Sequence, residues 1–180
     1  MKLRVLPLIF AAMLLSACQE NEAAAPPSPV AMTNEAVGYY CQMDVLEHSG
    51  PKAQIHLAKH SQPIWFAQVR DAIAYTRLPE ETAEVTAVYV HDMGAAESWQ
   101  HPGTDNWVNA SEAYFVLGST KTGGMGAPEA VPFAEKQAAE TFIAQHGGQL
   151  AKLSEIPDGY VLAPVNVSAA NDASQEGVNQ

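Results

Sequence analysis

Stretches with the two-residue alternation of a β-strand surround one stretch of helical periodicity in the first half of the chain. Residues 39–47 and 53–57 are predicted strands, and a Ser-Gly-Pro turn separates them. Apolar positions in residues 67–77 recur at the spacing of one face of an α-helix. Residues 85–90 are mostly β-branched or aromatic, which favours another strand. The predicted order of elements in this half is therefore β-β-α-β.

The second half of the chain shows the same order again. Residues 107–110 predict a short strand, and residues 114–118 predict a fully apolar, buried one. Residues 133–145 predict a helix, and the Gly-Gly pair that follows stands where glycine commonly ends one. Residues 149–153 predict the closing strand.

This repetition predicts an α+β fold of two related ββαβ modules. The first module spans residues 34–94 and the second spans residues 95–164. Residues 165–180 are rich in small and polar side chains without an apolar period, which predicts a disordered tail.

The chain begins with the features of a secretory signal. Lys2 and Arg4 precede a short apolar run that ends in Leu-Ser-Ala-Cys at Cys18. This tetrapeptide resembles the bacterial lipobox, which implies removal of residues 1–17 and attachment of lipid to the Cys18 sulfur. The apolar run is too short to span a bilayer as a helix, so acyl chains would hold the protein on the membrane. Residues 18–33 are small, acidic and proline-rich, which predicts a flexible linker.

The net charge is strongly negative. The full chain carries a formal charge of −11, and removing residues 1–17 takes away two basic residues and no acidic one, which leaves −13. An acidic surface repels the phosphates of nucleic acids, so a nucleic-acid partner is not expected. The same repulsion argues against a protein face lying on anionic lipid.

A thiol and a thioether lie two residues apart, at Cys41 and Met43. On an extended strand, side chains at this spacing point to the same face, so two soft sulfur donors would lie side by side. Such donors suit Cu(I), and they suit Ca²⁺ or Mg²⁺ poorly. The alternative is a half-buried strand in which both side chains fill the core.

The cysteine count makes Cys41 unusual. The chain has two cysteines, so lipid on Cys18 would leave Cys41 without an intramolecular disulfide partner. A free thiol in an oxidising compartment is exposed to oxidation, and metal binding or a reactive-thiol role would explain its presence. The sequence contains no recognisable oxyanion-hole motif beside this cysteine, and we predict that the protein is not an enzyme.

Three further residues are candidate ligands. Met125 lies in a glycine-rich loop, where a large apolar side chain is poor core material and has room to move toward a metal. Met93 follows a predicted strand, and His48 lies near the Cys41–Met43 pair. Packing or a surface position is the alternative for each. The glycine-rich loop lacks the Lys-Ser/Thr of a phosphate-binding loop, so a phosphate ligand is not expected.

Several short motifs together resemble the NosL family. The resemblance covers about residues 15–160 and rests on the lipobox, Tyr40-Cys41-Gln42-Met43, Glu47-His48-Ser49-Gly50-Pro51, Val90-His91-Asp92-Met93-Gly94 and Gly123-Gly124-Met125-Gly126-Ala127-Pro128. This family is known as lipoprotein copper chaperones that serve nitrous oxide reductase assembly. The resemblance implies a fold of two homologous ββαβ modules. It also implies two partners, nitrous oxide reductase and its membrane ABC-type maturation complex.

The resemblance also implies a copper site built on the Cys-x-Met motif, here Cys41 and Met43, with Met125, Met93 and His48 as further donors. The expected protein is a periplasm-facing, membrane-anchored lipoprotein that binds one Cu(I) and passes it on. The alternative is a lipoprotein scaffold that docks a maturation complex and holds at most a structural metal.

Overall fold

The computed structural model describes residues 25–165. The predictions for the signal at residues 1–17, for lipid on Cys18 and for most of the tail lie outside these residues. Within the described range, no helix is both long and apolar enough to cross a bilayer.

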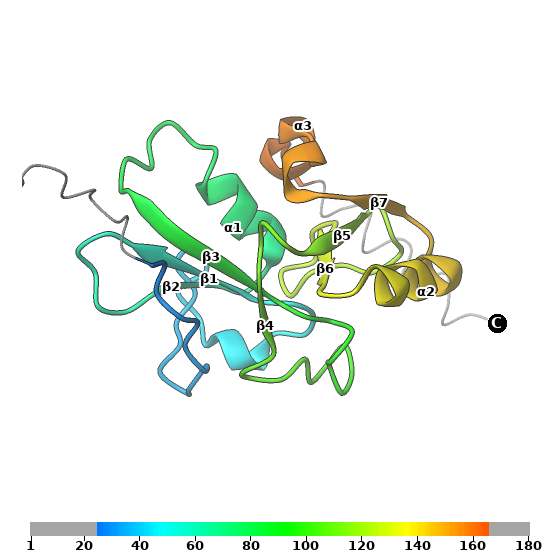
Figure 1. The fold of residues 1–180 in the computed structure, drawn as a ribbon, viewed down its shortest axis with the longest axis horizontal. Coiled ribbons are helices and arrows are strands. Elements are labelled where there is room, and N and C mark those ends of the chain that lie inside the picture. Colours follow the sequence, from blue (N-terminus) through cyan, green and yellow to red (C-terminus); the bar gives the residue numbers. More distant parts are fainter. Residues whose placement is uncertain (1–24, 166–180) are drawn as a thin grey trace, which may run out of the picture.

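An antiparallel four-stranded sheet forms the first part of the fold (Figure 1). Its first strand in the sequence lies in an inner position, because it pairs with the strands on both sides. A single helix, Val69–Tyr75 (α1), packs on this sheet. In spatial order the strands are Ile64–Phe66 (β2), Ala53–Leu57 (β1), Val85–His91 (β3) and Trp107–Asn109 (β4).

A three-stranded antiparallel sheet lies beside the first (Figure 1). The longer helix Lys136–His146 (α2) packs on this sheet. It is followed by Gly147, whose φ of +70° suits glycine. The chain closes with a short 3₁₀ turn, Leu153–Glu155 (η2), and the helix Asp158–Leu162 (α3), which contacts α1. The strand order is Val131–Phe133 (β6), Tyr114–Leu117 (β5) and Gln149–Ala151 (β7).

The mixed helix-and-strand architecture confirms the α+β prediction. In each sheet the chain first forms the inner strand and then a short strand beside it. It continues through a helix and adds a strand on the other side of the inner one. This order is compatible with two related ββαβ modules. The short strands β2 and β6 were not predicted, because three residues are too few to show a period. Strand β4, which was predicted to open the second module, pairs with β3 of the first sheet.

Residues 39–47 do not form the predicted strand. They form a turn followed by the 3₁₀ segment Val45–Glu47 (η1), which is capped by the Asp44 side chain. The reason lies in the turn chemistry, because Gln42 adopts a positive φ of +56° and ends any extended run.

One apolar core joins the two sheets. It combines Ile55 of β1 and Ile73 of α1 with Phe115 of β5 and Val161 of α3. A backbone hydrogen bond from Met93 to the Pro132 carbonyl also connects the end of β3 with β6. The two sheets are therefore held together by packing as well as by the chain.

Residues 25–32 lie against the face of the first sheet that α1 leaves open. The side-chain amide of Gln54 accepts a hydrogen bond from the Val30 N–H and donates one to the Val30 carbonyl, both at 2.9 Å. The Tyr89 hydroxyl donates to the Pro27 carbonyl. This cover explains why all five residues of β1 are buried, including the polar ones. The second half of the predicted linker thus lies against the sheet.

Replacing Gln54 tests this arrangement. In Gln54→Leu the Val30 N–H and carbonyl lose two partly buried hydrogen bonds, each with a net value of about 0.5–1.5 kcal/mol. We expect the Val30 amide to exchange with solvent much faster, measured by hydrogen exchange, while amides in α2 keep their protection. Unchanged exchange at Val30 would contradict the assignment of Gln54 as the residue that holds this segment.

Candidate metal site

Cys41 lies in a tight loop of residues 38–43. The Gly38 N–H donates to the Met43 carbonyl at 2.9 Å, and the Gln42 N–H donates to the Gly38 carbonyl at 2.8 Å. A side chain at Gly38 would collide with Cys41 Sγ, so the loop closes around the sulfur only because this position is glycine. The prediction that Cys41 and Met43 share the face of a strand is therefore wrong.

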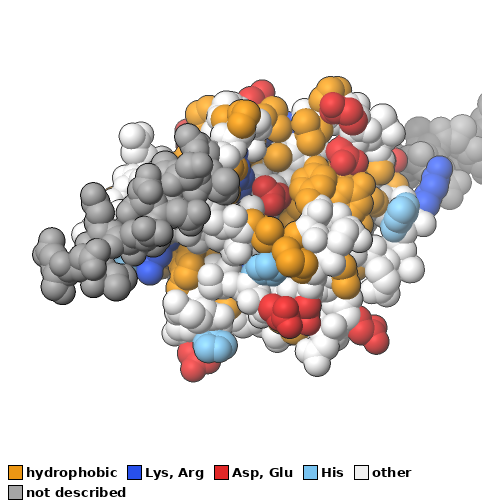
Figure 2. All heavy atoms as spheres, turned by 180° about the vertical axis from the view of Figure 1, so that it is seen from behind, with side chains coloured by type: hydrophobic (Ala, Val, Ile, Leu, Met, Phe, Trp, Pro, Cys, Tyr) orange, Lys and Arg blue, Asp and Glu red, His pale blue; other side chains and the backbone are white. Residues whose placement is uncertain are grey.

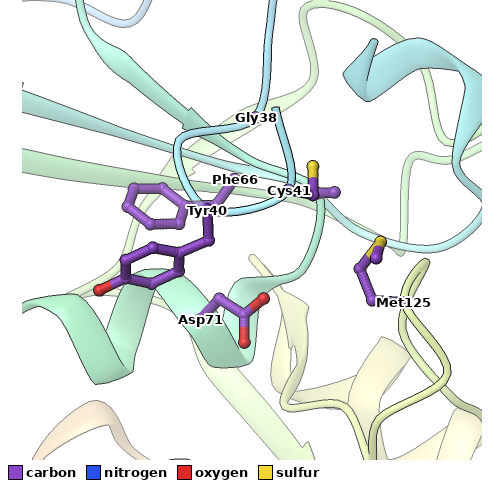
Figure 3. Close-up of a pocket in the computed structure, with 7 residues that line it drawn as sticks. Gly38, Tyr40, Cys41, Phe66, Asp71 and Met125 are labelled. Atoms are coloured by element: carbon purple, nitrogen blue, oxygen red, sulfur yellow. The ribbon is translucent and has the colours of Figure 1, made fainter. Parts of the chain in front are cut away.

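An open cavity of about 210 Å³ brings Cys41 and Met125 together. In Figure 3, Cys41 comes from the 38–43 loop and Met125 from the glycine-rich loop on the other side, with Asp71 of α1 below them. The thiol is partly exposed and forms no disulfide. The complete lining is Gly38, Tyr40, Cys41, Phe66, Ala67, Asp71 and Met125.

The loop that carries Met125 is a compact hairpin. Thr122 bridges to Pro128, and the Gly123 N–H donates to the Ala127 carbonyl at 2.8 Å. Gln68 Oε1 accepts hydrogen bonds from the N–H groups of Met125 at 3.1 Å and Ala127 at 3.4 Å. The loop backbone is therefore held in place, while the Met125 side chain remains exposed.

Gln68 also reaches the other side of the cavity. Its Nε2 donates to Asp71 Oδ2 at 2.8 Å, so one side chain connects the Met125 loop with a carboxylate in the cavity wall. Burial raises the pKa of Asp71, and the hydrogen bond from Gln68 opposes that rise. Gln68 precedes the first residue of α1 but does not cap it with its side chain.

The cap of α1 comes instead from Glu129, which follows the Met125 loop. Its Oε1 accepts from the Arg70 N–H at 2.8 Å, and its Oε2 accepts from the Val69 N–H at 3.3 Å. These two N–H groups have no partner within the helix, so the carboxylate satisfies them. Burial raises the pKa of Glu129 to about 8, and the N–H groups oppose this change.

His48 contacts the Met125 loop but lines a different cavity. Its Nδ1 lies 3.2 Å from the Gly124 carbonyl oxygen, and its Nε2 is buried without a hydrogen-bond partner among the described residues. The second cavity, of about 270 Å³, is also lined by Met32, Lys52 and His101. His48 is thus near the candidate site without lining it.

Met93 and Met43 lie outside the Cys41 cavity. Met93 packs against the apolar cluster of the second sheet, near Val116 and Phe133. Met43, the last residue of the 38–43 loop, is exposed on the surface. His91, the neighbour of Met93, is fully buried against Trp107, with ring centroids 4.1 Å apart. Burial lowers the pKa of His91 to about 3, which keeps its ring neutral.

Of the five residues predicted from the sequence, the structure therefore places two on one cavity. The cavity also uses residues that the sequence analysis missed, namely Asp71, Tyr40 and Phe66, and the supporting Gln68. The only signal available for Gln68 and Asp71 is their three-residue spacing at the start of a predicted helix. Among residues 25–165, no three His, Cys, Asp or Glu side chains gather as a metal site.

Sequence comparison and structure comparison with known proteins point to the same family. A sequence model of the NosL family matches residues 29–161. A relative from Achromobacter cycloclastes, named copper-binding lipoprotein NosL, is 48% identical over 176 residues, which cover 97% of this chain and 91% of the relative. A relative of the same name from Stutzerimonas stutzeri is 31% identical over 143 residues, covering 79% of this chain and 73% of the relative.

A solved structure has the same fold. The crystal structure of the copper chaperone NosL from Shewanella denitrificans superposes with a TM-score of 0.67 at 35% sequence identity, covering 73% of this chain and 97% of the other. The family resemblance inferred from short motifs is thereby confirmed. The chain belongs to the NosL family.

Proposed function

We propose that this protein is a lipoprotein Cu(I) chaperone that faces the periplasm and delivers copper for the maturation of nitrous oxide reductase. The observation that carries the proposal is the open cavity that Cys41 and Met125 share. Relatives named as copper-binding lipoproteins and a copper chaperone support it, and none of these is named as an enzyme. The ion is cargo here, held for transfer.

The two sulfur atoms supply the chemistry that Cu(I) prefers. A thiolate from Cys41 provides charge and the stronger bond, and the thioether of Met125 adds a neutral soft donor. Met43 is exposed two residues away, so it is the nearest source of a third sulfur along the chain. His48 contacts Gly124, and its Nε2 has no hydrogen-bond partner among the described residues. Met93 could reach the ion only by leaving the apolar cluster of the second sheet.

A low number of donors at an open cavity favours transfer. A partner's ligand can approach the ion from the solvent side and replace one thioether at a time, so copper need not be released into water. A lipid on Cys18 would keep this exchange close to the membrane that holds the ABC-type maturation complex. The alternative function is that of a scaffold protein with a structural metal. A scaffold of this kind would not take Cu(I) from a strong chelator.

Removing individual sulfur atoms tests the site. Cys41→Ser should weaken Cu(I) binding far more than Met125→Leu, because a hydroxyl is a hard donor that stays protonated. We expect Met125→Leu to bind about tenfold more weakly, which corresponds to about 1.4 kcal/mol. Competition with a Cu(I) chelator measures both effects, and circular dichroism checks folding.

The matched control for these variants is Met93→Leu, which preserves packing in the second sheet and should bind like the wild type. A folded Cys41→Ser variant with wild-type affinity would place the site elsewhere. A wild-type protein that cannot compete with the chelator at all would favour the scaffold.

Gln68 should affect copper through Met125. Gln68→Leu removes the acceptor for the Met125 and Ala127 N–H groups and introduces no new sulfur, so the loop should lose its fixed position. We expect X-ray absorption to count one sulfur neighbour fewer and the affinity to fall to about that of Met125→Leu. In a Met125→Leu background, Gln68→Leu should have no further effect. Additive losses would show that Gln68 acts on the site by another route.

A further inference from the structure

Exposed apolar side chains concentrate around the mouth of the Cys41 cavity. The described residues include eight large apolar side chains that are exposed. Four of them belong to the two loops that carry the sulfur atoms, and a fifth directly precedes the 38–43 loop. These five are between 39% and 49% exposed. We call this set the mouth patch; it consists of Val37, Tyr39, Tyr40, Met43 and Met125. Scattered apolar residues are normal on a surface, but a contiguous group beside a site marks an interaction surface.

Two buried aromatic side chains hold the two tyrosines of the patch in place. The Tyr39 ring stands edge-on to Tyr75 with centroids 5.4 Å apart, and the Tyr40 ring stands edge-on to Phe66 at 5.5 Å. Phe66 and Tyr75 are themselves buried. Because the two tyrosine rings are already held, covering them with a partner costs little side-chain entropy. Aromatic anchors in protein interfaces share this property.

The surroundings of the patch are acidic. Asp71 lines the same cavity as Tyr40. Burial raises the pKa of Tyr40, and the negative charges of Glu81 and Asp71 add to that rise. Figure 2 shows apolar side chains gathered near the centre of one face with acidic side chains at their border. The Arg77 guanidinium, which follows α1, is paired with Asp158, so its charge is offset.

We propose that the mouth patch docks the protein that receives copper, and that this acceptor presents an apolar surface bordered by Lys and Arg. The proposal rests on the proposed chaperone function and adds the surface through which transfer occurs. The negative border repels an anionic membrane, so a lipid surface is a poor occupant. An acceptor covering the patch would exclude water from the cavity while its own donors reach the ion.

The test uses the full mature chain loaded with Cu(I), and the variant Val37→Ser/Tyr39→Ser. Neither residue lines the cavity, so the copper site keeps its donors. The matched control is Leu162→Ser, which removes an equally exposed apolar side chain from α3. Two acceptors are compared for each protein: copper-free nitrous oxide reductase and a small Cu(I) chelator that needs no docking surface.

We expect the double variant to transfer copper to the reductase at least about tenfold more slowly, as loss of an aromatic anchor implies, and to the chelator at the wild-type rate. Leu162→Ser should behave as wild type with both acceptors. Glu81→Gln should slow transfer to the reductase at low salt and lose its effect at high salt, because screening removes the attraction.

Three results would overturn the proposal. One is a double variant that serves the reductase as fast as Leu162→Ser does. A second is equal slowing with both acceptors, which would show that the patch shapes the copper site itself. A third is a concentration-dependent dimer of the wild type, seen by sedimentation and lost in the double variant, which would assign the patch to a second copy. A wild-type protein that binds no Cu(I) would instead refute the proposed function.

Discussion

The hydrogen bonds between Glu129 and the start of α1 are the constraint on which the candidate site depends. Val69 and Arg70 begin the helix without a local side-chain cap, and their N–H groups find their acceptor in a carboxylate about sixty residues further along the chain. A cap supplied from so far away ties two elements together and satisfies the helix at the same time. A side chain at Gly123 would collide with Glu129 Oε2 and Gln68 Oε1 and displace one of them. Met125 is therefore placed by the helix, although it lies on a loop.

This arrangement gives the candidate site a fixed backbone and candidate ligands whose side chains can move. The backbones of the 38–43 loop and of the Met125 hairpin are held by hydrogen bonds, whereas the side chains of Met43 and Met125 are exposed. Methionine has three rotatable bonds and a soft, polarisable sulfur, so it can follow an ion over a short distance. A chaperone needs this combination, because a rigid, saturated site would hold copper too well to release it.

The sequence predicted the elements that have a clear period and failed where tertiary contacts decide. Strands β1, β3 and β5 and the two longer helices were expected at close to their observed positions. The turn at residues 38–43 was predicted as a strand, because the alternation of its side chains resembles one and nothing local shows that Gly38 must accommodate the Cys41 sulfur. Met125 was predicted from its chemistry, because a thioether side chain in a glycine-rich loop has few neighbours to pack against. Asp71 and Gln68 were missed because their role depends on contacts with the Met125 loop.

The docking of the early segment onto the first sheet limits how far the protein can work from its membrane. Hydrogen bonds hold the chain at Pro27 and Val30, so only eight residues lie between Cys18 and the first held position. The nine steps along the chain from Cys18 to Pro27 can span at most about 32 Å, at no more than about 3.6 Å each. With a lipid on Cys18, a connection of this length would keep the cavity of Cys41 and Met125 close to the membrane surface. Confinement of that kind raises the effective concentration of cargo for membrane-bound partners, in the way that a short linker does for a second binding site.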